Sequence, residues 1–302
     1  MNEAHSQYDF SVIIPTYQRP DGLARLLDSL ARLDYPRDRF EVIVVDDGGL
    51  NPVEPEISTF RQRLNLTLIE QPNRGPGGAR NRGAERATGR YLAFTDDDCV
   101  VDSKWLSELG RALAKSGDAI CGGCVANALP AVVCSVATQM LCDYLYEHYN
   151  PVDTQGAFFT TNNIVVPRDA FLAMGGFDSA LRFGEDREFC YRWTSQGRRF
   201  IYAPSAVVLH AHGLTLASLT RLHFCYGMGA AWFRERSRQA GLASVQVSPP
   251  RWYLNLVLSG VRRAKGLRGL MLSLLLAATQ TAAAAGFLWA RIAAPLDRRA
   301  EP

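Results

Sequence analysis

Short apolar runs alternate with amphipathic stretches along the first hundred residues of the chain. Continuous apolar runs predict four buried strands, at 10–15, 41–46, 64–69 and 91–95. Between them, residues 21–33 carry leucines at helical spacing, and residues 77–88 predict a second helix. Buried strands separated by helices are typical of parallel sheets covered on both faces. The pattern therefore predicts an α/β fold with a mostly parallel central sheet flanked by helices.

The second half of the chain mixes helical and extended patterns. Helices are predicted at 131–149, 185–196 and within 214–239, with extended segments at 163–167 and 200–209. Beyond a turn at Pro249-Pro250, residues 269–290 carry no charge. We therefore predict one large domain over residues 1–240 and a basic, apolar helical tail over residues 241–302.

Charge is distributed unevenly along the chain. The 302 residues are 47% hydrophobic and 21% charged, which is typical of a globular protein, and a net charge of +3 argues against general nucleic-acid binding. From Gly241 onward there are eight basic and two acidic residues, a balance of +6, so the first 240 residues carry −3. The body is thus mildly acidic and the tail basic.

Cysteine usage and the N-terminal residues predict a cytoplasmic protein. Seven cysteines are too few for a disulfide scaffold in a chain of this length. The spacing of Cys121, Cys124, Cys134 and Cys142 does not repeat a zinc knuckle, so we expect small buried side chains there. Residues 1–9 lack the basic start and apolar run of a secretory signal.

Polar residues follow the predicted strands. Asp46 and Asp47 end the second strand, and Asp96, Asp97 and Asp98 follow the fourth. Because ligands bind outside the carboxyl ends of parallel strands, we expect these carboxylates along one edge of the sheet. Carboxylates combined with phosphate suit Mg²⁺ or Mn²⁺, while a solvated acidic turn stays an alternative.

Three further segments carry candidate chemistry. Residues 73–81 open a helix with three glycines and two arginines, which favours an anion near Arg80, although glycine runs also serve tight turns. Asp186, beside Glu185, has the side chain of a general base or of a helix cap. His210 could complete a metal shell of carboxylates or be structural.

Taken in order, these motifs resemble those of the inverting family 2 glycosyltransferases with the GT-A fold. The resemblance covers residues 10–238, and it rests on the segments 11–17, 45–49, 95–98, 175–178 and 184–186 and on His210. It implies a GT-A-type nucleotide-diphospho-sugar transferase fold and a catalytic domain within residues 1–240. The QxxRW helix of processive synthases is absent after Asp186, so the resemblance favours the transfer of a single sugar.

The resemblance also implies roles for individual residues. Asp186 is expected to be the catalytic base, with Glu185 as its orienting neighbour. The residues expected to bind the nucleotide sugar are Pro15, Thr16, Tyr17, Arg19, Asp46, Asp47, Gly78, Arg80, Asn81, Asp96, Asp97 and Asn163. Asp98, Asp96 and His210 are expected to hold Mg²⁺ or Mn²⁺, with His212 as the fallback for His210. The partners implied are a nucleotide-sugar donor, UDP-linked, and a hydroxyl acceptor in cell-envelope polysaccharide, glycolipid or lipid-linked glycan synthesis.

Several alternatives stay open from the sequence. A sugar-nucleotide nucleotidyltransferase would carry a glycine-rich loop directly after the first strand, where this chain has Pro15-Thr-Tyr-Gln-Arg19. A non-catalytic, membrane-associated protein that retains the fold is a second alternative. The run 269–290 is long enough to span a bilayer, but it also fits an interfacial helix or a helix docked on the protein. Membrane association would place the protein at the inner face of the cell membrane.

Overall fold

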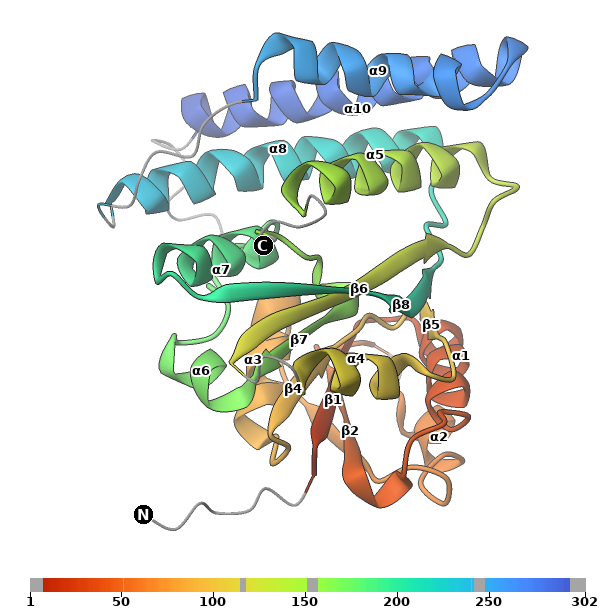
Figure 1. The fold of residues 1–302 in the computed structure, drawn as a ribbon, viewed down its shortest axis with the longest axis vertical. Coiled ribbons are helices and arrows are strands. Elements are labelled where there is room, and N and C mark those ends of the chain that lie inside the picture. Colours follow the sequence, from red (N-terminus) through yellow and green to blue (C-terminus); the bar gives the residue numbers. More distant parts are fainter. Residues whose placement is uncertain are drawn as a thin grey trace. The chain divides into compact units, whose positions relative to one another are not determined.

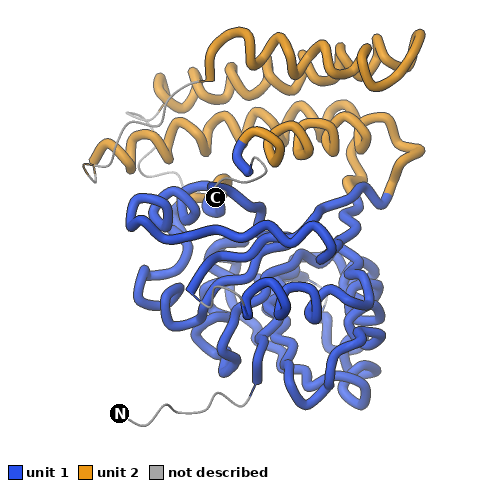
Figure 2. The backbone as a smooth tube through the Cα atoms, viewed as in Figure 1, with its two compact units in different colours: residues 1–128, 149–180, 185–211 blue, residues 129–148, 181–184, 212–302 orange. Residues whose placement is uncertain are grey.

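A computed structural model describes residues 8–50, 52–114, 118–150, 157–239, 241 and 248–293 of the chain (Figure 1). The chain divides into two compact units, shown in Figure 2. The first unit comprises residues 1–128, 149–180 and 185–211, and the second comprises 129–148, 181–184 and 212–302. The domain boundary predicted between 240 and 241 stays a prediction, since residue 240 lies outside the described residues.

The first unit is built on a mixed sheet that has eight strands within the described residues, in the order β3-β2-β1-β4-β7-β6-β8-β5. The strands are β1 Phe10–Thr16, β2 Phe40–Asp46, β3 Leu66–Glu70, β4 Tyr91–Phe94, β5 Cys99–Val101, β6 Ala119–Asn127, β7 Ile164–Pro167 and β8 Arg199–His210. Strand β1 runs parallel to β2 and β4, β2 to β3, and β6 to β8. Strand β7 is antiparallel to β4 and β6, and β5 is antiparallel to β8. The predicted α/β fold with a mostly parallel sheet is confirmed.

Helices cover this sheet. They are α1 Pro20–Leu30, α2 Glu54–Ser58, α3 Gly75–Arg86, α4 Trp105–Leu113, α6 Arg168–Ala173 and α7 Glu185–Ser195, with 3-10 turns η1 Arg37–Arg39 and η2 Thr161–Asn163. The leucines that the spacing placed on one face of α1 are buried in the same core as Val12 and Ile14 of β1. Burial on both faces explains why β1 and β2 read as continuous apolar runs.

The second unit is helical in its described residues. It contains α5 Val133–Tyr149, whose last residue belongs to the first unit, with α8 Leu216–Gln239, α9 Pro250–Arg263 and α10 Gly266–Ala293. Its core joins three of these helices through Ala137, Met140, Leu141, Leu256, Leu272 and Leu276. Helices α8 and α10 lie side by side with their backbones in close contact: a Cβ on Gly227 would lie 1.9 Å from the Ala283 carbonyl oxygen.

Helix α10 is the one helix among the described residues that is long and apolar enough to cross a membrane. Its most apolar window has a mean hydropathy of 1.6, and 28% of that window is buried.

The four cysteines whose spacing does not repeat a zinc knuckle lie on β6 (Cys121, Cys124) and on α5 (Cys134, Cys142).

Candidate active site

The residues that follow β1, β2 and β4 meet at one edge of the sheet. Thr16 lies opposite Asp46 in the register of β1 and β2, and its carbonyl accepts a hydrogen bond of 2.9 Å from the Asp47 N–H. Its hydroxyl donates to Asp97 Oδ2 at 2.8 Å. Thr16 therefore ties together the strand ends that carry both groups of aspartates.

The three consecutive aspartates after β4 have three different environments. Asp97 is buried, and it also accepts a hydrogen bond of 3.3 Å from Arg19 Nη1, which in turn donates to Asp98 Oδ2 at 2.7 Å. Burial raises the pKa of Asp97 to about 6, against the charge of Arg19. The side chains of Asp96 and Asp98 are 25% and 22% exposed. Asp96 and Asp98 are therefore the more accessible members of the run.

His210, at the end of β8, completes a group that can hold a cation. Its Nε2 lies 3.0 Å from Asp98 Oδ1, and its Nδ1 lies 3.1 Å from the amide nitrogen of Asn162. Ligand atoms of Asp98, Cys99 and His210 lie within 4.8 Å of one another. Burial raises the pKa of the Cys99 thiol well above its usual value, and a soft sulfur donor does not suit Mg²⁺ or Mn²⁺. Asp98 and His210 are the better donors.

Arg80 joins the two acidic motifs. This arginine of α3 is 4% exposed; its Nη2 donates to Asp96 at 2.6 Å and its Nη1 donates to Glu185 at 2.7 Å. Burial raises the pKa of Glu185 to about 7, although the charge of Arg80 opposes the shift. The sequence predicted that Arg80 would bind an anionic ligand. In the structure its guanidinium bridges two carboxylates, and ligand binding by Arg80 stays a prediction.

Asp186, the next residue of α7, is free of this ion pair. One carboxylate oxygen accepts a hydrogen bond of 2.7 Å from the Arg187 N–H at the start of the helix. Burial raises the pKa of Asp186, and the negative charge of Asp96 contributes in the same direction. A raised pKa makes a carboxylate a stronger base than an ordinary one, as general-base catalysis requires. Asp186 thus has the properties of a general base.

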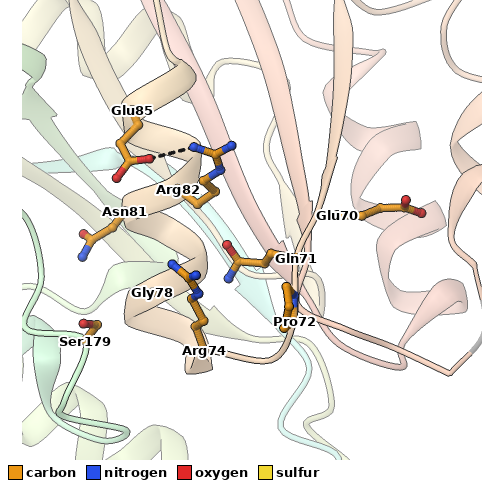
Figure 3. Close-up of a pocket in the computed structure, with 9 residues that line it drawn as sticks. All are labelled: Glu70, Gln71, Pro72, Arg74, Gly78, Asn81, Arg82, Glu85 and Ser179. Atoms are coloured by element: carbon orange, nitrogen blue, oxygen red, sulfur yellow. Dashed lines mark hydrogen bonds and ion pairs between the residues drawn. The ribbon is translucent and has the colours of Figure 1, made fainter.

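Two cavities lie beside β3 and α3. The larger, of about 520 Å³, is shown in Figure 3 between the side chains of α3 and the residues that end β3. Its lining is Glu70, Gln71, Pro72, Arg74, Gly78, Asn81, Arg82, Glu85 and Ser179. The smaller, of about 140 Å³, shares Glu70 and Gln71 and includes Asp46. Asp47 Oδ1 accepts hydrogen bonds from Gln71 and from the Arg74 N–H, so it holds the loop between the two cavities.

Comparison with known proteins identifies the family. Residues 11–177, more than half of the chain, match the model of Glycosyl transferase family 2. The chain belongs to this family. It is therefore a nucleotide-sugar glycosyltransferase, and the family and the enzyme class predicted from the motifs are confirmed.

Curated relatives match this glycosyltransferase over different shares of their own length. Glycosyltransferase AglE of Haloferax volcanii is 27% identical over 231 residues, which are 75% of each chain. The pre-mycofactocin glycosyltransferase of Mycobacterium tuberculosis is 30% identical over 239 residues, which are 75% of this chain but 47% of the relative. The chain thus spans about half the length of the second relative.

Solved structures share the fold at low identity. The mannosyltransferase PcManGT from Pyrobaculum calidifontis, in complex with GDP-Man and Mn²⁺, matches with a TM-score of 0.65 and 19% identity, covering 96% of this chain and 88% of that one. TarS residues 1–349 from S. aureus, in complex with UDP, match with a TM-score of 0.56 and 16% identity, covering 97% and 93%. These likenesses establish a GT-A-like architecture for this glycosyltransferase.

Not every residue predicted for the glycosyltransferase site lies open to it. Asn163 is fully buried: its Oδ1 accepts a hydrogen bond from Trp105, and its Nδ2 donates to the carbonyls of Cys124 and Ala206. These bonds engage the amide oxygen and both amide hydrogens of Asn163, so its side chain supports the fold. Its neighbour Asn162 contacts His210 instead.

The other predicted residues are distributed as follows. Asn81 exchanges two hydrogen bonds with the main chain of Phe177, and together with Gly78 it lines the larger cavity. Tyr17 is 46% exposed directly after β1, and Pro15 lies within that strand. His212, the predicted fallback for His210, belongs to the second unit. It is His210 that contacts Asp98.

Proposed function

We propose that this glycosyltransferase is metal-dependent and inverting, and that it moves a single sugar from a UDP-linked donor to a hydroxyl acceptor. The observation that carries the proposal is the bridge by Arg80, which holds Asp96 and Glu185 on one buried guanidinium. The aspartates expected to bind the donor and the helix start expected to carry the catalytic base are thus joined at one place. Transfer between two bound molecules requires that juxtaposition.

For the donor, the nucleotide is proposed to bind where β1 and β2 end. Asp46 and Tyr17 offer a carboxylate and an exposed ring beside the smaller cavity and the end of β1. TarS has been crystallised with UDP-GlcNAc and PcManGT with GDP-Man, so both nucleotides occur among structures of this fold. UDP is the nucleotide we propose here, and GDP is the alternative that the experiment below separates from it.

The proposed metal ligands fit a hard divalent cation. Asp98 and His210 are already in contact, whereas Asp96, the third predicted ligand, is ion-paired with Arg80 and lies outside that cluster. A carboxylate oxygen suits Mn²⁺ or Mg²⁺, and an imidazole is more usual on transition metals, which favours Mn²⁺. When bound, such a cation would supply positive charge to the diphosphate leaving group. Arg19, which contacts Asp97 and Asp98, would add a further positive charge at this edge.

Asp186 is proposed to remove the proton from the acceptor hydroxyl. Its neighbour Glu185 is unsuited to this role, because a buried ion pair of 2.7 Å holds it to Arg80. Glu185 is instead proposed to fix the start of α7, and with it the position of Asp186. Attack by the deprotonated hydroxyl on the face opposite the departing diphosphate inverts the anomeric carbon.

The acceptor is proposed to be a hydroxyl compound of cell-envelope synthesis, held at a membrane or linked to lipid. The support is the long apolar helix α10 in a basic tail. A membrane-held acceptor is reached most readily by an enzyme that itself binds the membrane.

The test combines ligand binding with donor turnover. Because a ligand that binds only the folded state raises the melting temperature, UDP-, GDP- and dTDP-sugars are compared by thermal shift, with Mn²⁺ and with EDTA. We expect stabilisation by a UDP-sugar that requires Mn²⁺, and donor hydrolysis that EDTA abolishes. The Asp98→Asn variant should lose the metal-dependent part, whereas Asp118→Asn, at an exposed ion pair with Arg198, should keep it. Stabilisation by a GDP-sugar alone would overturn the UDP assignment, and stabilisation unchanged by EDTA would overturn the metal.

A further inference from the structure

Helix α10 presents an apolar face that the described residues leave uncovered. Six large side chains on it are between 50% and 73% exposed: Leu267, Leu270, Leu274, Leu288, Trp289 and Ile292. At 100° per residue these positions fall within about 100° of arc, so they form one stripe along the helix. The opposite face, including Leu272 and Leu276, is buried in the second unit.

The charge around this stripe is of one sign. Residues 248–293 contain six basic residues (Arg251, Arg262, Arg263, Lys265, Arg268 and Arg291) and no acidic residue. Arg263 pairs with Asp143 and Glu147 of α5. Arg262, Lys265 and Arg291 have no ion pair within the described part of the chain. Arg262 lies in the last turn of α9, Lys265 directly precedes α10, and Arg291 lies near the end of α10. An apolar stripe with basic residues at both ends complements a surface that is apolar beneath an anionic layer.

The packing of α10 argues against a span across the bilayer. Helix α8 contacts it closely: a Cβ on Gly227 would lie 1.9 Å from the Ala283 carbonyl oxygen, and one on Gly286 would lie 1.9 Å from that of Phe224. Further along, the guanidinium of Arg234 lies 5.4 Å from the centre of the Phe287 ring. These contacts hold α8 and α10 together as one body.

Helix α8 is too charged to enter the hydrocarbon with α10. Arg221 lies six residues before Gly227, about 9 Å along the helix. A span by residues 269–290 in this packing would carry Arg221 into the membrane beside α10, and a charged side chain there is unfavourable by several kcal/mol.

We propose that α10 lies in the plane of an anionic bilayer surface, with the stripe from Leu267 to Ile292 inserted at the level of the headgroups. The proposal rests on the membrane association proposed above and specifies how that association occurs. The positive residues at both ends of α10 attract anionic lipid, and the rest of the second unit stays on the aqueous side.

The first experiment measures binding of the full-length protein to vesicles of phosphatidylglycerol and phosphatidylcholine. We expect binding that requires phosphatidylglycerol and weakens with salt, since salt screens the attraction. Leu274→Glu should lower the partition coefficient about tenfold or more, because it places a charge in the inserted stripe. Leu172→Glu, at an exposed leucine of α6 in the first unit, is the matched control and should bind as the unaltered protein does.

The second experiment separates an in-plane helix from a span. Trp289, which is 57% exposed, should become blue-shifted on binding and be quenched by lipids brominated near the headgroup. A tryptophan placed at Thr281, midway along the charge-free run, in a Trp289→Phe background should be quenched at the same shallow depth. Deep quenching at position 281, or resistance to carbonate extraction, would overturn the in-plane helix while leaving membrane association intact. Absence of vesicle binding would overturn both, and a dimer disrupted by Leu274→Glu would then identify a second copy as the partner.

Discussion

The two compact units differ in the kinds of polar side chain that they bury. In the first unit, buried ionisable groups gather near the carboxyl ends of the strands, with Arg80 between Asp96 and Glu185, and Asp97 bonded to Thr16. In the second unit, the described buried polar side chains are serines, threonines and histidines: Ser135, Thr138, His212, His223, Ser237, Ser273 and Thr279. Its helices are instead held by apolar contacts and by close backbone approach at glycines.

We interpret this difference as a division of roles, in which the first unit carries out the reaction and the second unit supports it. Burying an ion is unfavourable unless a partner of opposite charge and further hydrogen bonds compensate it. The first unit retains such ions beside the proposed metal ligands and the proposed base. The second unit has no such requirement, and its apolar surface extends to the exposed stripe of α10.

The largest expected effect tests whether the buried charges serve catalysis. Asp186→Asn removes the proposed base and should lower kcat by about 10²- to 10⁴-fold. The affinity for the nucleotide sugar, measured by calorimetry, should be retained. Glu188→Gln is the matched control. Glu188 lies two residues beyond the proposed base on the same helix and pairs with Arg192, so this variant should keep most of the activity. An active Asp186→Asn enzyme would remove the base assignment.

The next effect concerns the stability of the same cluster. Arg80→Met leaves Asp96 and Glu185 without their partner, and it should destabilise the folded protein by about 3–5 kcal/mol at pH 8. The loss should shrink at pH 5, because Glu185, whose pKa is already raised by burial, can then take up a proton. Urea denaturation at both pH values measures it. Arg82→Met, which removes an exposed pair with Glu85 on the same helix, should change stability by less than about 1 kcal/mol. Equal losses for the two variants would contradict the buried bridge.

The sequence predicts the fold best where the local pattern matches the final environment. Strands β1, β2 and β4 each contain a nearly continuous apolar run because both faces are buried, and this run predicts them. Strand β6 was missed, since Gly122 and Gly123 interrupt its apolar pattern. In the structure a Cβ at Gly122 would overlap the ring of Phe159, and one at Gly123 would overlap the amide of Asn163. The partners that make glycine suitable there lie far away in sequence.

The site shows the same limit. Motifs identified its carboxylates and His210, but neighbouring residues of the same type could not be told apart. Asn162 and Asn163 follow each other in the turn η2, and only the fold directs one towards His210 and the other into the core beside Trp105. The bridge by Arg80 could not be predicted from the sequence, because its partner Glu185 lies 105 residues away.

A smaller effect concerns the pH dependence of folding stability, which we expect to differ in sign between the two units. Burial lowers the pKa of His223 on α8 from 6.5 to about 4, so the unfolded chain binds the proton more readily. The stability from this residue is fully present above pH 6.5 and is lost as the pH falls towards 4, by about 3 kcal/mol in all. Glu185 acts in the opposite direction. Its pKa is raised from 4.5 to about 7, so its contribution is fully present below pH 4.5 and is lost as the pH rises through 7.

Denaturation from pH 4 to pH 8 separates the two contributions. His223→Gln should remove part of the stability loss on the acid side, and Glu185→Gln should remove part of the loss on the alkaline side. If His223→Gln left the acid limb unchanged, His223 would not be buried in its neutral form, and the uncharged interior of the second unit would be in doubt.

The smallest effect tests the contact that replaces charge in the second unit. Alanine is normally more stable than glycine within a helix, by about 1 kcal/mol. Gly227→Ala should nevertheless destabilise the protein by about 1–3 kcal/mol, because the new Cβ would meet the Ala283 backbone and force α8 and α10 apart. Gly213→Ala, where no atom lies within 4 Å of the added Cβ, should be close to neutral. Since no charge is involved, the loss at Gly227 should be the same at low and at high salt, in contrast to effects that arise from ion pairs. Stabilisation by Gly227→Ala would mean that α8 and α10 do not touch at this point and are not held together there as one body.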